Sequence, residues 1–509
     1  MPYTFRTDIG SSHYHDDKAS HQLGATICAY QTRQWDAKYH DLISHNLRPL
    51  MVLPATRSAQ TEAMCFFEYI SIKHLNEYRP NETWRKILMF FSQTVPSVRY
   101  AAVALALVNR SYLDRDSGDH AQQPSSSKDW LPSKDALFHY NRAIQLLLNQ
   151  DFDDSVETTA ITLLVCYLFT CFDHLAGNYV QATRHLRGGV ELSRNIDTGI
   201  LNNNTYGDTK FSAVCTLICQ VTRQIRRLDM QAATFLVDWI PINVQETPMP
   251  DSLSSSNAFR SLDQAADHLQ VLIARVMGLR NTEQQMYLMG GMSSPPPSPI
   301  KDYILNELET WSSLFENMPQ KGDSYESDPE TYPLISLLRL QHLIIWTFLS
   351  SYGAGREMEY DNYLPQFQQC VALADVVVAA HERYSGSIKP TFTPEIGVVP
   401  VLYIIGIKCR HPVVRREVLS ILRRRPIREA IWDSISAARV VERVIEIEEG
   451  GSEKKGMIQS MEQIAVRQRV EALSWIQVLC ESAARVDITY TFCTQEGVHN
   501  ESLMVQHLM

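Results

Sequence analysis

The chain lacks the cysteine spacing of common small zinc modules. Its ten cysteines include no C-x-x-C pair, and the closest pairs are Cys166/Cys171 and Cys215/Cys219. Structural zinc sites collect four Cys or His ligands, usually from closely spaced pairs. Cys215 and Cys219 share one face of an expected helix, so a metal site there is one interpretation. Buried thiols are the favoured one, because no His or further Cys joins them, and we predict no metal site.

Long apolar runs and a secretory signal are also missing. The longest apolar stretch, Ala160 to Phe172, has thirteen residues, whereas a membrane-spanning helix needs about 20. The stretch Ile335 to Leu349 is interrupted by polar residues, so both are predicted to be core helices. Because no basic start precedes an apolar run at the N-terminus, we expect no signal peptide, reduced cysteines and no membrane association.

An excess of positive charge is absent as well. The formal net charge is -10, with 45% hydrophobic and 20% charged residues. These values are typical of a soluble globular protein. They argue against nucleic-acid binding over the whole surface, although one basic face remains compatible with them.

Catalytic motifs are not found. The chain contains no G-x-S-x-G, H-E-x-x-H or phosphate-binding loop, and the G-x-G at residues 353–355 follows an expected helix and reads as a turn. His139, His174 and His185 fall on different helical segments. They could meet in the fold, but core or surface histidines are commoner. We therefore predict no enzyme, no catalytic residue and no cofactor.

What the sequence does contain is helical periodicity. Apolar residues recur every three or four positions in many segments, which is typical of amphipathic helices. Even Leu402 to Ile407, which resembles a strand, is predicted to be a buried helix because no partner strand is visible elsewhere. The pattern predicts an all-α fold, an array of antiparallel helix pairs.

Composition divides the chain into four regions. Residues 1–58 are polar and are predicted to form a mobile N-terminal tail. Residues 59–285 and 331–509 are predicted to be the two halves of a helical regulatory region. Between them, residues 286–330 are read as a Pro/Ser-rich and acidic linker. Its two Ser-Pro pairs at 294–295 and 298–299 are either plain surface linker, which is favoured, or phosphorylation sites.

The densest arginine cluster lies in Lys408 to Ser434, KCRHPVVRREVLSILRRRPIREAIWDS. Pro412 and Pro426 each suit the first turn of a helix, so two helices in tandem are predicted. In the first, apolar residues form one face and the solvent side is expected to carry Arg415, Arg416, Arg423 and Arg424.

In the second predicted helix, one buried stripe runs from Ile427 to Ile445, and Gly450-Gly451 ends the helix. Its C-terminal turn carries Glu446, Glu448 and Glu449, which the helix dipole disfavours. We therefore expect the arginines to neutralise these glutamates. Such a cluster can also bind phosphate, nucleic acid or an acidic partner, but a structural face, laced with Glu417 and Glu429, is favoured.

Several segments together resemble the regulatory region of fungal zinc binuclear cluster transcription factors. The resemblance spans about residues 60 to 450 and rests on segments that follow the family order: 95–107, 139–148, 163–189, 359–361, 409–412 and 428–434. The last, REAIWDS, is the most specific. His411 stands where an acidic helix cap is usual, and Ala430 stands where glycine is usual. The family's zinc cluster, with its six cysteines, is not found in this sequence.

The resemblance implies a nuclear transcriptional regulator of secondary metabolism. The chain would be the regulatory and effector part, and a biosynthetic gene cluster would be a fitting target. It would act through protein partners of the transcription machinery or a DNA-binding regulator, with a small-molecule effector as a further partner. No direct DNA binding is expected of this chain, unless a misplaced start codon hides a zinc cluster. The alternative is a cytoplasmic all-helical scaffold without a transcriptional role.

Overall fold

The computed structural model describes thirteen stretches of the chain, and helices account for 75% of the residues in them. The described residues are 57–114, 132–149, 156–194, 196, 209–236, 239–241, 258–288, 299–318, 332–351, 356–385, 391–450, 458–479 and 484–505. The predicted tail at 1–58, apart from its last two residues, and the two Ser-Pro pairs, apart from Pro299, lie outside them.

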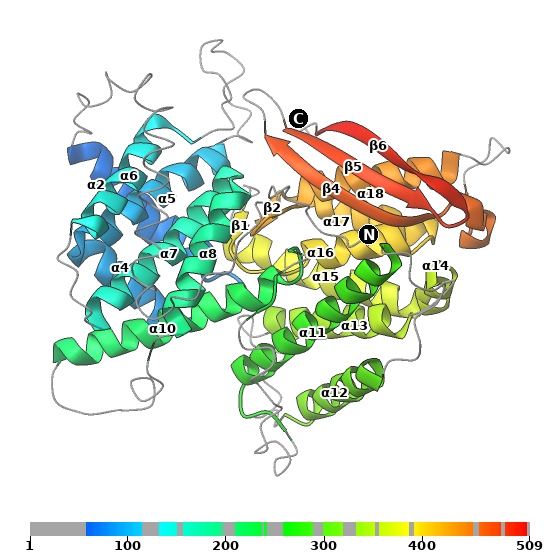
Figure 1. The fold of residues 1–509 in the computed structure, drawn as a ribbon, viewed down its shortest axis with the longest axis horizontal. Helices are drawn as coiled ribbons and strands as arrows, with labels where there is room; N and C mark the ends of the chain where they lie inside the picture. Colours follow the sequence, from blue (N-terminus) through cyan, green and yellow to red (C-terminus); the bar gives the residue numbers. More distant parts are fainter. Residues whose placement is uncertain are drawn as a thin grey trace, which may run out of the picture.

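The first half is built from α-helices on one side of the molecule (Figure 1). Asn81 and Ser133 begin two of them by accepting hydrogen bonds from the amides of Trp84 and Ala136, which otherwise have no partner in a first turn. The helices are α2 (Arg57–Phe66), α3 (Ile72–His74), α4 (Glu82–Thr94), α5 (Pro96–Asp114), α6 (Lys134–Leu148), α7 (Val156–Ala176), α8 (Tyr179–Arg194) and α10 (Thr209–Ala232), with a π-helical turn η2 (Phe67–Ser71).

Helices α7 and α8 form a hairpin in the first half, which is one of the antiparallel helix pairs expected from the sequence. Helix α7 is buried almost all round, and α8 packs antiparallel to it. Gly177 ends α7 with a φ of 72°, a left-handed conformation that glycine adopts without steric cost. At its amide, Asn178 donates to the carbonyl of Asp173 at 2.8 Å, which satisfies one carbonyl of the last turn.

The second half is also mainly helical. Leu402 to Ile407 lies in a buried helix, as predicted. The helices are α11 (Leu262–Leu288), α12 (Pro299–Glu316), α13 (Tyr332–Ser350), α14 (Arg356–Glu359), α15 (Leu364–Ser385), α16 (Val399–Lys408), α17 (Pro412–Arg424) and α18 (Ser434–Gly450), with 3-10 turns η4 (Tyr360–Tyr363), η5 (Met461–Gln463) and η6 (Val466–Gln468). Helix α12 lies within the predicted linker at 286–330, so this part of the linker is helical.

Two helices are long and apolar enough to cross a membrane by length and composition. These are α7 and α13, but 89% and 61% of their most apolar windows are buried inside the protein. Helix α7 is longer than the thirteen-residue apolar run that predicted it. Segments with polar residues extend the helix at both ends. Burial of this kind is what the sequence predicted for both segments.

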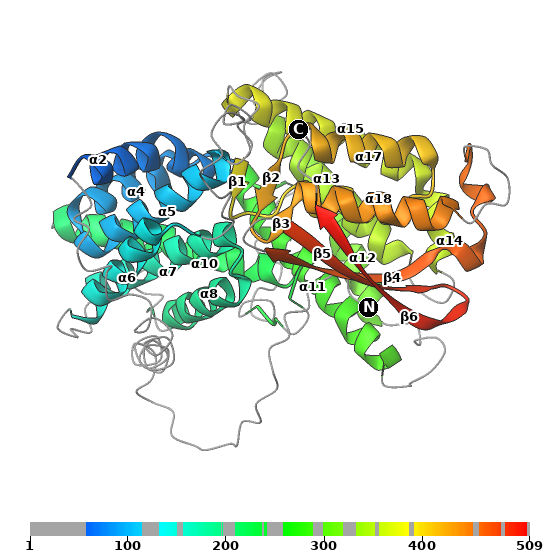
Figure 2. The same ribbon diagram turned by 90° about the horizontal axis from the view of Figure 1, so that it is seen from above.

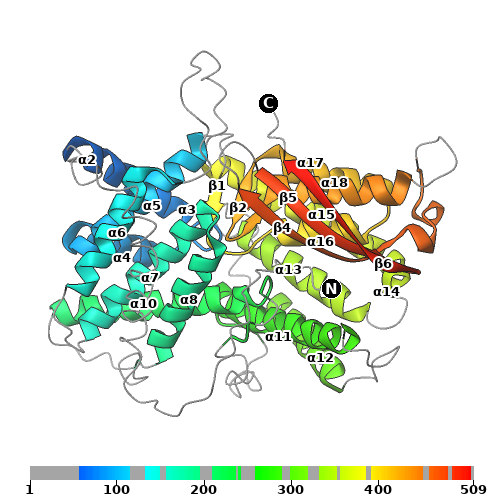
Figure 3. The same cartoon turned by 45° about the horizontal axis from the view of Figure 1, so that its top comes forward.

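The predicted all-α class holds for most of the described residues, but the C-terminal region contains a sheet that was not predicted. Strands β4 (Val470–Leu479), β5 (Ala484–Phe492) and β6 (Gln495–Val505) form an antiparallel sheet in the order β4-β5-β6. Alternate residues of β5 are buried, so one face packs on the protein, and α18 contacts all three strands. Figure 3 shows this sheet lying along α18 and α16. The period-two pattern was the missed signal.

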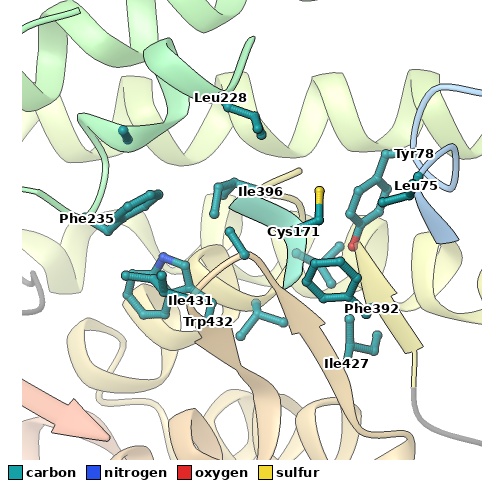
Figure 4. Close-up of a cluster of buried hydrophobic side chains, with 14 of the residues drawn as sticks. Leu75, Tyr78, Cys171, Leu228, Phe235, Phe392, Ile396, Ile427, Ile431 and Trp432 are labelled. Carbon is teal, nitrogen blue, oxygen red and sulfur yellow. The ribbon is translucent and has the colours of Figure 1, made fainter. Parts of the chain in front are cut away.

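A second, smaller sheet lies between the two halves (Figure 2). Strand β1 (Thr391–Thr393) pairs parallel with β2 (Ile427–Glu429), which pairs antiparallel with β3 (Trp432–Asp433). Figure 4 shows apolar side chains of both halves gathered around it, among them Tyr78 and Cys171 from the first half and Phe392 from the second. One continuous apolar core therefore joins the halves.

The tandem-helix prediction for Lys408 to Ser434 is half right. Pro412 opens α17 as expected, but Pro426 precedes β2 and opens no helix. The next helix, α18, begins only at Ser434 and ends at Gly450. Ile427 and Ile431 are buried as predicted, yet from a strand and a turn, because a two-residue turn at 430–431 interrupts the helical period.

Candidate functional site

Polar residues of α6, α7 and α8 meet in one buried cluster. The Tyr140 hydroxyl donates to Asp173 Oδ2 at 3.2 Å and lies 2.6 Å from His185 Nε2. The rings of Phe169 and Phe172 lie 4.0 and 4.9 Å from that of Tyr140, centroid to centroid. The cluster thus links the segments 139–148 and 163–189 through three hydrogen-bonding side chains inside an aromatic shell.

Burial favours the neutral forms of this cluster. Desolvation raises the pKa of Asp173 well above its usual value, against a smaller lowering by the Tyr140 hydrogen bond. Burial, aided by the charge of Arg184, lowers the pKa of His185 to about 4, although 19% of its side chain stays exposed. Asp173 and His185, both joined to Tyr140, thus form a buried hydrogen-bonded unit in which desolvation disfavours charge on either partner.

The three histidines named from the sequence have different surroundings. His185 belongs to the polar cluster, whereas His139 stacks on Tyr100 with ring centroids 5.5 Å apart. His174 contributes its backbone carbonyl to Arg428, and burial together with that guanidinium lowers the pKa of its imidazole to about 3.

Arg428, in strand β2, joins the second half to the end of α7. Its Nη1 donates to the carbonyls of His174 and Leu175 at 3.4 and 3.3 Å. These carbonyls carry the partial negative charge of a helix C-terminus, so the buried guanidinium stabilises them. Its Nη2 donates to Gln477 Oε1 at 3.2 Å and lies 3.6 Å from Asp433 Oδ2.

Glu429, the next residue of β2, reaches the start of another helix. Its carboxylate accepts from the amides of Gly397, Val398 and Val399 at 2.8, 2.9 and 3.1 Å, and also from the Tyr78 hydroxyl. Adjacent residues of a strand point to opposite sides, which separates Glu429 from Arg428. These amides lie at the N-terminus of α16, which begins at Val399, and a negative charge is favourable there.

The rest of the REAIWDS segment completes the junction. Asp433 Oδ1 caps α18 by accepting from the Ser436 amide at 2.7 Å. Ala430 has a φ of 50° and is the one described non-glycine residue with positive φ. Left-handed backbone is costly for a residue with a Cβ, so the turn between β2 and β3 is strained there.

Gln477 of β4 holds both halves and the C-terminal sheet together. Its Oε1 accepts from the Tyr179 hydroxyl of α8 at 2.8 Å and from Arg428, while its Nε2 donates to Ser436 Oγ at 2.9 Å. The sequence did not indicate Gln477, because no local pattern marks a buried glutamine whose hydrogen-bond partner, Tyr179, lies almost 300 positions away. We call this set of residues the helix-end junction: Tyr78, Arg428, Glu429, Asp433 and Gln477.

A buried ionic network lies beneath the C-terminal sheet, which contains β4. Arg410 joins Glu357 at 2.9 Å and Glu448 at 3.1 Å, and Lys408 and Arg415 pair with the same two glutamates. Glu448 also accepts from the Val470 amide of β4 at 2.8 Å. Arg415 is fully buried, so its predicted place on the solvent side is wrong. Such charges remain buried only when paired and hydrogen-bonded.

The remaining arginines of α17 are more exposed and each pairs with a carboxylate. Their partners are at 2.6 to 2.7 Å: Arg416 with Glu449, Arg423 with Glu442 and Arg424 with Asp375. The predicted neutralisation of the glutamates at the end of α18 is therefore confirmed for Glu448 and Glu449. Glu429, by contrast, is buried at α16 and is not part of a solvated face. This favours the structural interpretation of the arginine cluster.

Residues 359–361 and 409–412, distant in sequence, are also neighbours in this network. Asp361 receives two hydrogen bonds from Arg469, at 3.0 and 2.7 Å. Arg469 also donates to the Glu357 carbonyl at 3.2 Å, and Glu357 pairs with Arg410. Arg469 was not found from the sequence, because it lies on a short turn before β4 with no motif around it.

Within the described residues, no group of three or more His, Cys, Asp or Glu side chains is placed to hold a metal ion. Cys215 and Cys219 lie on α10 as free thiols, and Cys166 and Cys171 are buried in α7. The described part of the chain thus offers hydrogen-bonded and ionic clusters that join helices rather than a ligand set. Comparison of the chain with protein-family models, with curated proteins and with solved structures finds no match.

Proposed function

We propose that this chain is the regulatory and effector part of a fungal-type transcriptional regulator that acts through protein partners in the nucleus. The observation that carries the proposal is spatial. Five of the six segments on which the resemblance rests, far apart in sequence, fall into two buried groups. Tyr140, Asp173 and His185 join two segments, and Arg428 joins the second of these to REAIWDS. In the other group, Asp361 is linked to Arg410 through Arg469 and Glu357.

Residues that maintain one fold are expected to contact one another. The segments therefore support a shared architecture with such regulatory regions, in which the helix-end junction holds two helical halves in a fixed relation. Regulation would follow if a partner or a small effector changed that relation, because packed interfaces have discrete arrangements. Contact with DNA would come from another chain.

The test is transcriptional. Deleting the gene should change a limited set of transcripts, with a neighbouring biosynthetic gene cluster as a fitting target, and the full chain should restore them. The variant Gln477→Leu, which removes three hydrogen bonds at the junction, should restore them less well than Gln468→Leu, a substitution outside the junction. Unchanged transcripts genome-wide after deletion would refute the proposal.

Localisation separates this proposal from the cytoplasmic scaffold. A fluorescently tagged full chain should accumulate in nuclei, and steady nuclear exclusion would favour the scaffold. Immobilised chain should retain proteins of the transcription machinery but not bare DNA. Strong salt-dependent retention of bare DNA would contradict the partner-mediated mechanism.

A further inference from the structure

The C-terminal sheet ends in a long strand whose outer side is open. Strand β6 pairs with β5 along one side, and no other described strand pairs with it along the other. Its sequence, QEGVHNESLMV, contains no Lys, Arg or Pro, the residues that commonly protect such edges. The strand pairs regularly with β5 from His499 to Val505 and bulges at 496–498 opposite Thr491, and its open edge presents backbone donors and acceptors to a further strand.

Side chains on the same strand are exposed as well. Val498 and Met504 expose 55% and 54% of their surface. Even positions of β6 form the outer face, since Leu503 and Val505 are buried while Ser502 is exposed. The edge therefore combines open backbone with apolar side chains, and it lies on the outside of the molecule (Figure 1).

We propose that β6 pairs with β6 of a second copy of this chain, antiparallel and centred on Asn500. Residues 495–505 are centred on position 500, so this register sets the bulged residues 496–498 of each copy opposite residues 502–504 of the other. It places His499 opposite the partner's Glu501, and the twofold axis repeats that complementary pair. Asn500 meets its own copy, and an amide side chain carries both donors and an acceptor.

The outer face fits the same register. Val498 lies opposite the partner's Ser502 and diagonal to the partner's Met504, which brings the exposed apolar side chains together. On the inner face, Glu501 accepts from Arg443 and Tyr490. A carboxylate has about four acceptor positions, so one remains for the partner's His499. Charge and apolar contact therefore favour one occupant, a second copy.

The mass of the full chain in solution tests the pairing. Light scattering after size-exclusion chromatography, over a wide range of concentrations, should give twice 58.1 kDa for the natural sequence. The double variant Val498→Lys with Ser502→Lys places lysines opposite each other twice and should give 58.1 kDa. The variant Val498→Glu with Ser502→Lys places opposite charges in the same register and should restore the doubled mass.

Circular dichroism of each variant confirms that the helical body is folded. A natural chain that stays at 58.1 kDa at all concentrations overturns the proposal and leaves β6 to another partner or to the chain itself. A doubled mass that survives the two lysines also overturns it, because the dimer then uses another face. A doubled mass in the natural chain that the charge-swapped variant fails to restore rejects this register. None of these results depends on a role in transcription.

Discussion

Removing the negative charge of Glu448 should destabilise this protein more than any comparable change on the same helix. Glu448 is fully buried and holds Arg410, Arg415 and the Val470 amide. The two guanidiniums lower its pKa to about 2 despite an opposing desolvation effect. A drop from 4.5 to about 2 corresponds to about 3 kcal/mol of stability at neutral pH.

The sign of the pH dependence follows from the lowered pKa. Because the folded state favours the ionised carboxylate, the contribution is complete above about pH 4.5 and is lost as the pH falls towards 2. In the variant Glu448→Gln two buried arginines lose a shared counter-charge. Such a loss costs about 3–5 kcal/mol, and the acid-dependent part of the unfolding curve due to this residue should disappear.

Urea unfolding followed by tryptophan fluorescence measures the free energy of unfolding. Glu446→Gln is the matched control, because Glu446 lies on the same helix, is 43% exposed and pairs with Arg439 and Arg443 at the surface. Exposed pairs contribute about 0–1 kcal/mol. A Glu448→Gln loss no larger than that of the control would refute the reasoning that burial makes this network important.

Three further changes test other sites. Asp173→Asn should stabilise the protein at neutral pH. Burial raises the pKa of Asp173, so this carboxyl lowers the free energy of unfolding as the pH rises above about 4. If urea unfolding at pH 7 shows a lower free energy of unfolding for the variant, Asp173 forms an ion pair with His185 instead. Ala430→Gly should raise the free energy of unfolding by about 0.5–1 kcal/mol, since glycine relieves the positive φ, and a lower melting temperature would contradict this. Gly397→Ala should lower the free energy of unfolding by about 1–3 kcal/mol, because its Cβ would lie 2.2 Å from the Tyr78 ring. Gly278→Ala is the control: its Cβ would have open space around it, so a thermal melt should show no loss of stability or a gain.

The sequence alone determined most of the helical body. Apolar stretches place α7, α13 and α16 close to where they were expected, because a helix that is apolar on most sides must be buried whatever its partner is. Pro412 and Gly450 likewise mark the ends of helices through local sterics. The burial of Ile427 and Ile431 also followed from their apolar character, although their conformation did not.

Only the tertiary structure decided the rest. Ile427 to Asp433 became two short strands rather than a helix, because β1 supplies a partner and Arg428 and Glu429 must reach two helix ends on opposite sides. Arg415 was placed in the core, not in solvent, because Glu448 lies beside it in the fold. Both outcomes depend on residues far away in sequence, and no local pattern carries that information.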